Sequence, residues 1–225
     1  RSTLTNFAPG ADCRSTLAAL EYFGPSYRGV VVLDDAVTDA ELATLDRAGV
    51  RGVRFNFAKF LALVPELGMF ERVTRRVGEL GWHIVLHVQP HDILQHADLF
   101  RSLPATWVID HMAHLELENE TGRRALALMV ELLKDGRWWI KLSNGDRMSR
   151  GGPPFADVVE IGRTLAAAAP ERAIWGTDWP HVLYAKPEMV NDGDLMSLLH
   201  DFVPDAAARR KILVDNPAAL YGFKD

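Results

Sequence analysis

Short apolar runs alternate with helical patterns along most of this chain, and the alternation limits the folds that the chain can adopt. Six runs rich in β-branched and aromatic residues are predicted to be strands, at 29–34, 52–57, 83–88, 106–111, 138–143 and 173–178. Near-continuous apolar strands suit a parallel sheet that helices cover on both faces. The pattern therefore predicts an α/β protein with a parallel sheet.

Polar residues stand where the predicted strands end, which favours a closed barrel over an open, doubly wound sheet. Reactive side chains of a (β/α)8 TIM barrel lie at the C-terminal ends of its strands. The ends here carry Asp34, Arg54, Asn56, His87, Gln89, His111, Ser143, Asn144 and Asp178. The sequence has no G-x-G-x-x-G motif, which weakens a nucleotide-binding doubly wound fold. We expect one TIM barrel domain over residues 1–225, with a single site at the strand ends.

The six predicted strands are two fewer than a TIM barrel needs. Residues 1–14 show no strand pattern, and the first helical pattern begins abruptly at Ser15. An open barrel of six strands would expose sheet edges and an apolar interior. We therefore expect that the first two βα units are missing from this sequence, with the gap between Arg14 and Ser15.

The composition excludes several classes of partner. A net charge of −5 at pH 7 provides no basic surface for nucleic acid or for an anionic membrane. No apolar stretch approaches the roughly 18 residues of a membrane span. The single cysteine, Cys13, permits no internal disulfide and fits a reducing compartment. We expect a cytoplasmic enzyme that handles a small molecule, with neither a nucleic-acid partner nor a membrane association.

The run I-W-G-T-D-W-P-H, residues 174–181, places an acid and a histidine at the end of the last predicted strand. Asp178 follows the apolar residues, and His181 stands three positions later. An acid at the end of a buried strand is costly unless it is paired, bound to a metal or used in chemistry. The two residues could bind a metal, move a proton or hold a substrate. A helix-capping role for Asp178 is opposed by Trp179-Pro180.

Histidines also end two other predicted strands. His111 ends the run V-I-D-H, where it is either a site residue or a core histidine bonded to a backbone carbonyl. Side chains alternate along a strand, so we expect Asp110 to face the outer helices instead. His87 and Gln89 share a strand face near the same end and are candidates to bind the substrate.

Arginines near the strand ends indicate an anionic substrate. Arg54 lies inside an apolar run that ends at Asn56, and a buried guanidinium needs an anion, either a substrate carboxylate or an acid of the barrel. Arg147 follows another strand end on a loop that could close over an acidic substrate. Several arginines at one mouth would select a small molecule with two or more negative charges.

Taken together, these motifs resemble the amidohydrolase superfamily. The resemblance rests on G-T-D-W-P-H (176–181), V-I-D-H (108–111), R-G-V-R-F-N (51–56), W-I-K-L-S (139–143) and D-N-P-A-A-L-Y-G-F (215–223), and it runs in order over residues 15–223. The sequence is most similar to the 2-pyrone-4,6-dicarboxylate hydrolase (lactonase) branch of amidohydrolase family 2. The resemblance implies a TIM barrel that hydrolyses carboxylate-bearing lactones of aromatic catabolism.

The resemblance also implies roles for individual residues. Asp178 would be the general base that activates water, and His111 would polarise the carbonyl or join Asp178 in binding a metal. Arg54 and Arg147 would hold substrate carboxylates, and His181 would line the pocket. The family opens with an H-x-H motif, which does not follow Asp12-Cys13 here. The resemblance therefore leaves open either no cofactor or one divalent, zinc-like metal.

Two other functions remain open at this point. One is a metal-dependent decarboxylation or hydration of an aromatic-derived acid within the same superfamily. The other is a non-catalytic ligand-binding protein, which the absence of H-x-H would explain.

Overall fold

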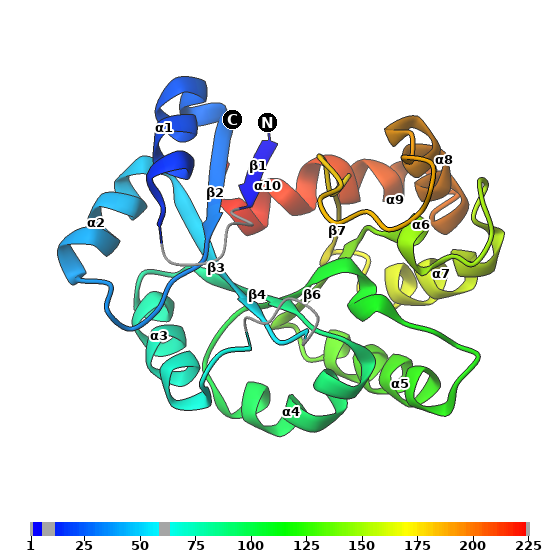
Figure 1. Ribbon diagram of the computed structural model, residues 1–225, viewed down its shortest axis with the longest axis horizontal. Coiled ribbons are helices and arrows are strands. Elements are labelled where there is room, and N and C mark those ends of the chain that lie inside the picture. The colour runs from blue at the N-terminus through cyan, green and yellow to red at the C-terminus, as the bar shows by residue number, and fades with distance from the viewer. Residues whose placement is uncertain (1, 6–11, 59–63, 224–225) are drawn as a thin grey trace. The chain divides into compact units, whose positions relative to one another are not determined.

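The protein was analysed as a computed structural model, which describes residues 2–5, 12–58 and 64–223. The chain divides into two compact units. The first comprises Arg1–His87, His96–Val108 and Ala218–Asp225, and the second comprises Val88–Gln95 and Ile109–Pro217. Helices and strands alternate along both units (Figure 1). Because the strand pairs within each unit are parallel, the predicted parallel α/β class is confirmed.

Four parallel strands form the sheet of the first unit. They are β1 (Ser2–Thr5), β2 (Tyr27–Val31), β3 (Val50–Asn56) and β4 (His83–His87), and each pairs with the next strand along the chain. The prediction of no strand in residues 1–14 is wrong, because β1 lies there. Its sequence S-T-L-T is polar and only partly buried, so it lacks the apolar run that marks the other strands.

Helices cover the sheet of the first unit. There α1 (Arg14–Phe23) packs against β2, α2 (Asp39–Ala48) against β3, and α3 (Leu67–Glu79) against β3 and β4 (Figure 1). A capping box starts α2, in which the backbone N–H of Glu41 donates to Thr38 Oγ1 and the backbone N–H of Thr38 donates to Glu41 Oε2. Arg14 and Ser15 are consecutive residues of α1, so the gap predicted between them is not confirmed.

Parallel strands and covering helices also form the second unit. Strand β6 (Trp138–Leu142) pairs with β7 (Ala173–Trp175), with Ile140 opposite Ala173. The helical elements of this unit are η3 (Asp110–His114), α5 (Glu120–Lys134), α6 (Gly145–Met148), η4 (Ala156–Val158), α7 (Val159–Ala168), α8 (Asp192–Phe202), α9 (Ala206–Arg210) and η5 (Lys211–Asp215). Three elements run across the boundary between the units: α4 (Pro90–Ser102), β5 (Trp107–Ile109) and α10 (Asn216–Tyr221).

Aromatic side chains fill the core of the first unit. The ring of Phe70, on α3, lies 4.8 Å from that of Phe55 and 5.3 Å from that of Phe57. Phe100 lies 5.3 Å from Phe57 and 5.6 Å from Trp107. Each buried ring contributes about 1.5–3 kcal/mol by removal of apolar surface from water. This cluster fixes α3 against the strands that carry Arg54, Asn56 and His87.

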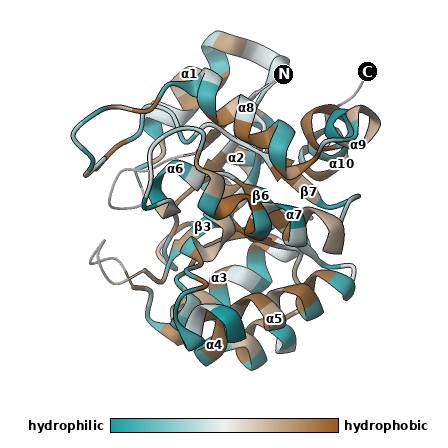
Figure 2. Cartoon of the chain, turned by 90° about the vertical axis from the view of Figure 1, so that its right-hand side faces the viewer, coloured by the Kyte–Doolittle hydropathy of each residue, from teal (hydrophilic) through white to brown (hydrophobic). Residues whose placement is uncertain are grey.

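In the second unit an amphipathic helix supplies much of the core. The buried residues of α5 recur at helical spacing, as Ala125, Met129, Leu132 and Leu133. Figure 2 shows the two sides of this helix, one hydrophobic and one hydrophilic. The apolar side packs on β6 and α7, which are the elements nearest to it in the unit.

Strands β5 and β7 end earlier than the sequence predicts. Strand β5 ends at Ile109 rather than at position 111, and β7 ends at Trp175 rather than at 178. The residues that follow have positive φ angles, 52° at His111 and 64° at Asp178, which no strand accommodates. The polar residues therefore lie in the turns after the strands.

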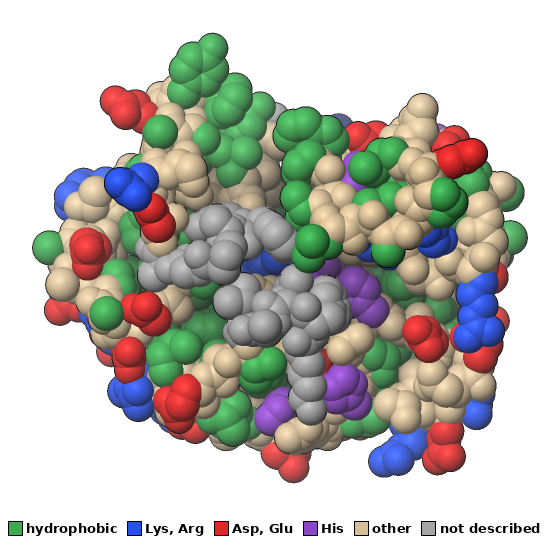
Figure 3. Space-filling view, in the orientation of Figure 1, with side chains coloured by type: hydrophobic (Ala, Val, Ile, Leu, Met, Phe, Trp, Pro, Cys, Tyr) green, Lys and Arg blue, Asp and Glu red, His purple; other side chains and the backbone are tan. Residues whose placement is uncertain are grey.

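No helix in the described part of the chain is long and apolar enough to cross a membrane. Hydrophobic side chains do reach the surface over α1 (Figure 3), where Tyr22 is 84% and Phe23 is 45% exposed. Phe23 stacks on Tyr27, with 4.3 Å between the ring centroids.

The packing of α7 on α8 can be tested by comparing two helical glycines, Gly162 and Gly78, whose surroundings differ. A methyl group at Gly162, in α7, would overlap the ring of Phe202 on α8, whereas one at Gly78, in α3, would lie 3.7 Å from its nearest neighbour, Pro104 O. We predict that Gly162→Ala lowers the free energy of unfolding by about 1–3 kcal/mol through overpacking. Gly78→Ala should raise it by up to about 1 kcal/mol through helix propensity. Urea unfolding at equal m-values measures both, and equal effects would contradict the packing of α7 on α8.

Candidate active site

A left-handed turn follows β5 and carries the first predicted catalytic residue. His111, Met112, Ala113 and His114 have φ angles of 52°, 49°, 52° and 50°. This conformation costs a residue with a side chain roughly 1–2 kcal/mol. Such strain persists only where the surroundings fix it, and it is frequent at active sites. The turn is buried from Asp110 to Ala113, which is consistent with a site built into the core of the unit.

The imidazole of His111 is held on both of its nitrogens. Nδ1 lies 2.8 Å from the hydroxyl oxygen of Ser143, which follows β6. Nε2 lies 3.4 Å from Asp110 Oδ2 and 3.6 Å from Asp178 Oδ1. Two carboxylates next to Nε2 favour a proton on that nitrogen, so Ser143 would donate its hydroxyl hydrogen to Nδ1 of the neutral ring.

Asp178, the predicted base, joins His111 and Arg147 in one cluster. Its Oδ2 lies 3.2 Å from Nη2 of Arg147, and 21% of its side chain remains exposed. The carboxylate is therefore flanked by an imidazole and a guanidinium yet stays accessible to water. Three residues from different parts of the sequence, His111, Arg147 and Asp178, are thus brought together, and their roles stay predictions.

Arg147 has further partners beyond Asp178. It lies on the short helix α6, and its guanidinium donates to the carbonyl oxygens of Val182 at 2.9 Å and Leu183 at 3.3 Å. The ring of Tyr184 lies 5.1 Å from the guanidinium carbon, in cation–π range. About a fifth of the Arg147 side chain remains exposed. Arg147 thus binds the backbone of a neighbouring loop, and part of its side chain is still accessible to solvent.

His181 is buried near this cluster, but its side chain has another partner. Its Nε2 lies 3.2 Å from Asp192 Oδ1, at the start of α8. Its backbone N–H donates to the carbonyl oxygen of Asp178 at 2.8 Å, which closes the turn that carries Asp178. The backbone of His181 is therefore bonded to Asp178, whereas its imidazole contacts Asp192 of α8.

Asp110 and Lys141 belong to the same cluster, although neither is predicted from the sequence to be a site residue. The expectation that Asp110 faces the outer helices is wrong, because its Oδ1 lies 2.7 Å from Lys141 Nζ and its Oδ2 near His111 Nε2. Strand alternation does not extend to Asp110, because β5 ends at Ile109. The signal for Lys141 was a cation inside the apolar strand run W-W-I-K-L, which requires a buried acid as its partner.

The other predicted substrate-binding residues lie on β3, on β4 and just after β4. Arg54 and Asn56 are buried on β3 and His87 is buried on β4, all in the first unit. Asn56 stands opposite His87 in the ladder, with 3.1 Å between Asn56 Oδ1 and His87 Nδ1. Gln89, in the second unit, donates its backbone N–H to Asp92 Oδ2 at the start of α4. The roles of these four residues stay predictions.

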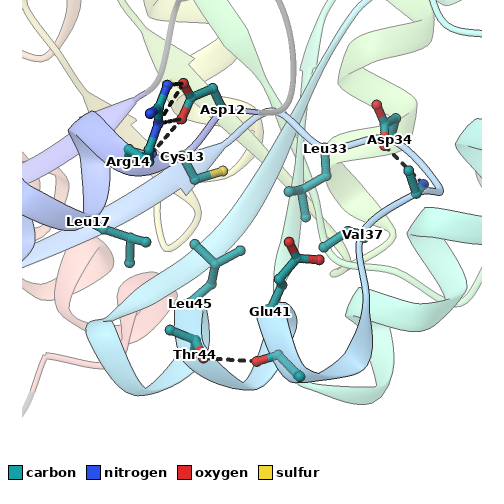
Figure 4. Close-up of a pocket in the computed structure, with 12 residues that line it drawn as sticks. Asp12, Cys13, Arg14, Leu17, Leu33, Asp34, Val37, Glu41, Thr44 and Leu45 are labelled. Carbon is teal, nitrogen blue, oxygen red and sulfur yellow. Dashed lines mark hydrogen bonds and ion pairs between the residues drawn. The ribbon is translucent and has the colours of Figure 1, made fainter.

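A separate cavity of about 530 Å³ lies between α1, α2 and the turn after β2 in the first unit (Figure 4). Its lining is mainly apolar, with Cys13, Leu17, Leu33 and Leu45 around it. Burial, together with the charges of Asp12 and Glu41, raises the pKa of the Cys13 thiol to about 11, so the thiol stays protonated at neutral pH. None of the residues with a predicted catalytic or substrate-binding role lines this cavity.

The cluster around His111 does not fit a divalent metal as it is arranged. Lys141 already pairs with Asp110 and Arg147 with Asp178, so each carboxylate has a cation beside it. No set of three His, Cys, Asp or Glu side chains within residues 2–5, 12–58 and 64–223 is arranged to hold a metal ion. The metal-binding role of His111 and Asp178 stays a prediction.

Three curated proteins resemble this chain over most of its length. A 2-pyrone-4,6-dicarboxylate hydrolase of Comamonas testosteroni is 36% identical over 221 residues, covering 94% of this chain and 72% of that protein. A 4-sulfomuconolactone hydrolase of Hydrogenophaga intermedia is 38% identical, covering 95% and 71%. A D-galactarolactone isomerase of Agrobacterium fabrum is 30% identical, covering 93% and 72%.

Solved structures share the fold. An Agrobacterium tumefaciens protein in its apo form superposes with a TM-score of 0.85 at 29% identity, over 100% of this chain and 80% of that one. A probable 2-pyrone-4,6-dicarboxylic acid hydrolase of Acinetobacter baumannii, with citric acid bound, superposes with a TM-score of 0.81 at 25% identity, over 98% and 83%.

The amidohydrolase family model matches residues 3–223. That match takes in most of β1 and most of both units, and it includes every residue of the His111 cluster. The chain belongs to the amidohydrolase family.

Proposed function

We propose that this protein hydrolyses a small lactone that carries negatively charged groups. The observation that carries the proposal is the Asp178 carboxylate, which lies between the imidazole of His111 and the guanidinium of Arg147 and remains exposed to water. A base, a proton donor and a cation are the groups that hydrolysis of an anionic lactone requires. The relatives named for 2-pyrone-4,6-dicarboxylate and 4-sulfomuconolactone support the substrate class.

In the proposed reaction, Asp178 acts as the general base. A water oxygen forms a bond to the lactone carbonyl carbon while the Asp178 carboxylate accepts a proton from that water. The ring C–O bond then breaks, and the proton passes to the leaving ring oxygen. One lactone and one water thus give one open-chain hydroxy acid or its tautomer.

His111 is proposed to stabilise the oxyanion that forms on the carbonyl oxygen. Its Nε2, where the nearby carboxylates favour a proton, lies 3.6 Å from Asp178 Oδ1, and Ser143 fixes the ring through Nδ1 at 2.8 Å. A donor held by such a partner is preorganised and needs no rearrangement as charge develops. The Lys141–Asp110 pair adjoins the same nitrogen and balances the charge there.

The accessible part of the Arg147 guanidinium is proposed to hold a carboxylate of the substrate. Arg54, Asn56, His87, Gln89 and His181 are proposed to complete the substrate pocket. Citric acid, bound in the Acinetobacter baumannii relative, is a tricarboxylate, and this supports an anionic substrate. Consecutive parallel strands and the likeness to the solved structures support a TIM barrel as the frame of the site.

A second candidate function is isomerisation of a lactone, which the similarity to the D-galactarolactone isomerase favours. The same base and proton donor could move an acyl group between two hydroxyls of one molecule. Such an isomerisation consumes no water, whereas hydrolysis adds one water to the product. The two functions are therefore distinguishable by the origin of the oxygen atoms in the product.

We predict that the purified protein converts 2-pyrone-4,6-dicarboxylate or 4-sulfomuconolactone in H₂¹⁸O to a ring-opened product that contains one ¹⁸O atom. Mass spectrometry of the product measures the label. A neutral lactone of similar size serves as the control and should react far more slowly, because it lacks an anion for the arginines. An unlabelled isomer as the sole product, from these lactones or from D-galactarolactone, would favour the isomerase instead.

We predict that Asp178→Asn lowers kcat by roughly 10²–10⁴-fold, the range expected when a general base is lost. The amide keeps the size of the side chain, so KM should change little. Asp201→Asn, an exposed position in the last turn of α8, makes the same charge change outside the site and should keep wild-type kinetics. Steady-state assays compare the three proteins, and near-wild-type turnover in Asp178→Asn would refute the assignment of the base.

A further inference from the structure

Two segments beside the candidate site are joined by hydrogen bonds from two cationic side chains, one on each segment. The β6 turn, residues 145–149, carries Arg147, which donates to the carbonyl oxygens of Val182 and Leu183. The β7 loop, residues 176–191, carries Lys186, whose Nζ donates to the carbonyl oxygens of Asp146 at 2.5 Å and Ser149 at 2.7 Å. Each segment therefore supplies the cation that binds the backbone of the other.

Tyr184, in the β7 loop, lies against Arg147 of the β6 turn. Its ring lies 5.1 Å from the guanidinium carbon of Arg147 and its centroid 6.1 Å from that of His181. Burial, followed by the nearby Asp146 carboxylate, raises the pKa of the Tyr184 hydroxyl, so this group stays protonated. The ring thus contacts the β6 turn through the guanidinium of Arg147.

The β7 loop depends on these contacts because it has little regular structure of its own. Strand β7 ends at Trp175 and α8 begins at Asp192, and no helix or strand lies between them. Positive φ angles occur at Asp178, His181 and Leu183 in this loop. The path of such a segment is set by side chains that bind its backbone rather than by a ladder of hydrogen bonds.

We propose that Lys186 is a positioning residue for the reaction at Asp178. It ties the β7 loop, which carries Asp178, to the β6 turn, which carries Arg147, and so keeps the carboxylate and the guanidinium in register. Lys186 binds two carbonyl oxygens of the β6 turn, so it would act on Asp178 through the two segments. The kinetic part of this inference rests on the proposed lactone hydrolysis.

Replacement of Lys186 by Met keeps the length of the side chain and removes the ammonium. We expect kcat to fall by roughly tenfold to a hundredfold, because a small misplacement of a catalytic group has effects of that size. KM should change less than kcat. Lys186→Arg should recover much of the activity, since a guanidinium can also donate to two carbonyl oxygens.

Lys134→Met is the matched control, because Lys134 is exposed at the end of α5 and loses the same charge. It should behave as the wild type. A rise in KM with kcat unchanged in Lys186→Met would overturn the proposal, because it would make Lys186 a substrate-binding group. Wild-type kinetics in Lys186→Met would overturn it as well.

Hydrogen exchange followed by mass spectrometry provides a readout that needs no activity. Amides of the peptide over 178–186 should exchange faster in Lys186→Met than in the wild type, while those of α5 stay unchanged. Equal exchange of that peptide in both proteins would contradict the link between the segments. Should the wild type hydrolyse no lactone, the proposed function fails, and the exchange experiment still decides whether Lys186 holds the loop.

Discussion

The structure of the second unit depends on cationic side chains that balance the charge of its buried carboxylates. Asp110 is almost fully buried, and its charge is matched by Lys141 at 2.7 Å and by the imidazole of His111. Removal of one partner of such a pair costs about 3–5 kcal/mol, because the other charge stays buried without compensation. Asp178 approaches the same imidazole nitrogen, Nε2, and has Arg147 as its cation. Acids and bases therefore alternate from Lys141 to Arg147, and each group holds the next in place.

Backbone strain lies in the same region as these charges. Positive φ angles occur at His111, Asn144 and Asp178, which follow β5, β6 and β7 respectively. Strain of this kind costs about 1–3 kcal/mol at each residue, so the packing and the ion pairs around it must hold it. In return, the functional side chains leave their strands in directions that a strand does not permit. Stability is thus lost at the strand ends, where the candidate site residues are placed.

Much of the fold and part of the site could be predicted from the sequence. Six apolar runs marked six of the described strands, and the polar residues after them included His111, Arg147 and Asp178, which the structure brings together. Strand β1 escaped prediction because its residues are polar and half exposed. The face of Asp110 was mispredicted because the strand period stops at Ile109, and a left-handed turn cannot be read from hydrophobic periodicity. The partner of His181 lies on a helix eleven residues further on, a distance that no local pattern encodes.

The hold of Arg147 on the β7 loop has a consequence for how specificity can diverge in this family. The guanidinium binds the main-chain oxygens of Val182 and Leu183, while the side chains of both residues are exposed. Every amino acid presents the same carbonyl oxygen, so these two positions can change identity without loss of the bonds that fix the loop. The backbone path of the loop therefore does not depend on which side chains stand at positions 182 and 183. Substitutions at Val182 and Leu183 can thus alter the exposed surface of the loop while Asp178 keeps its place.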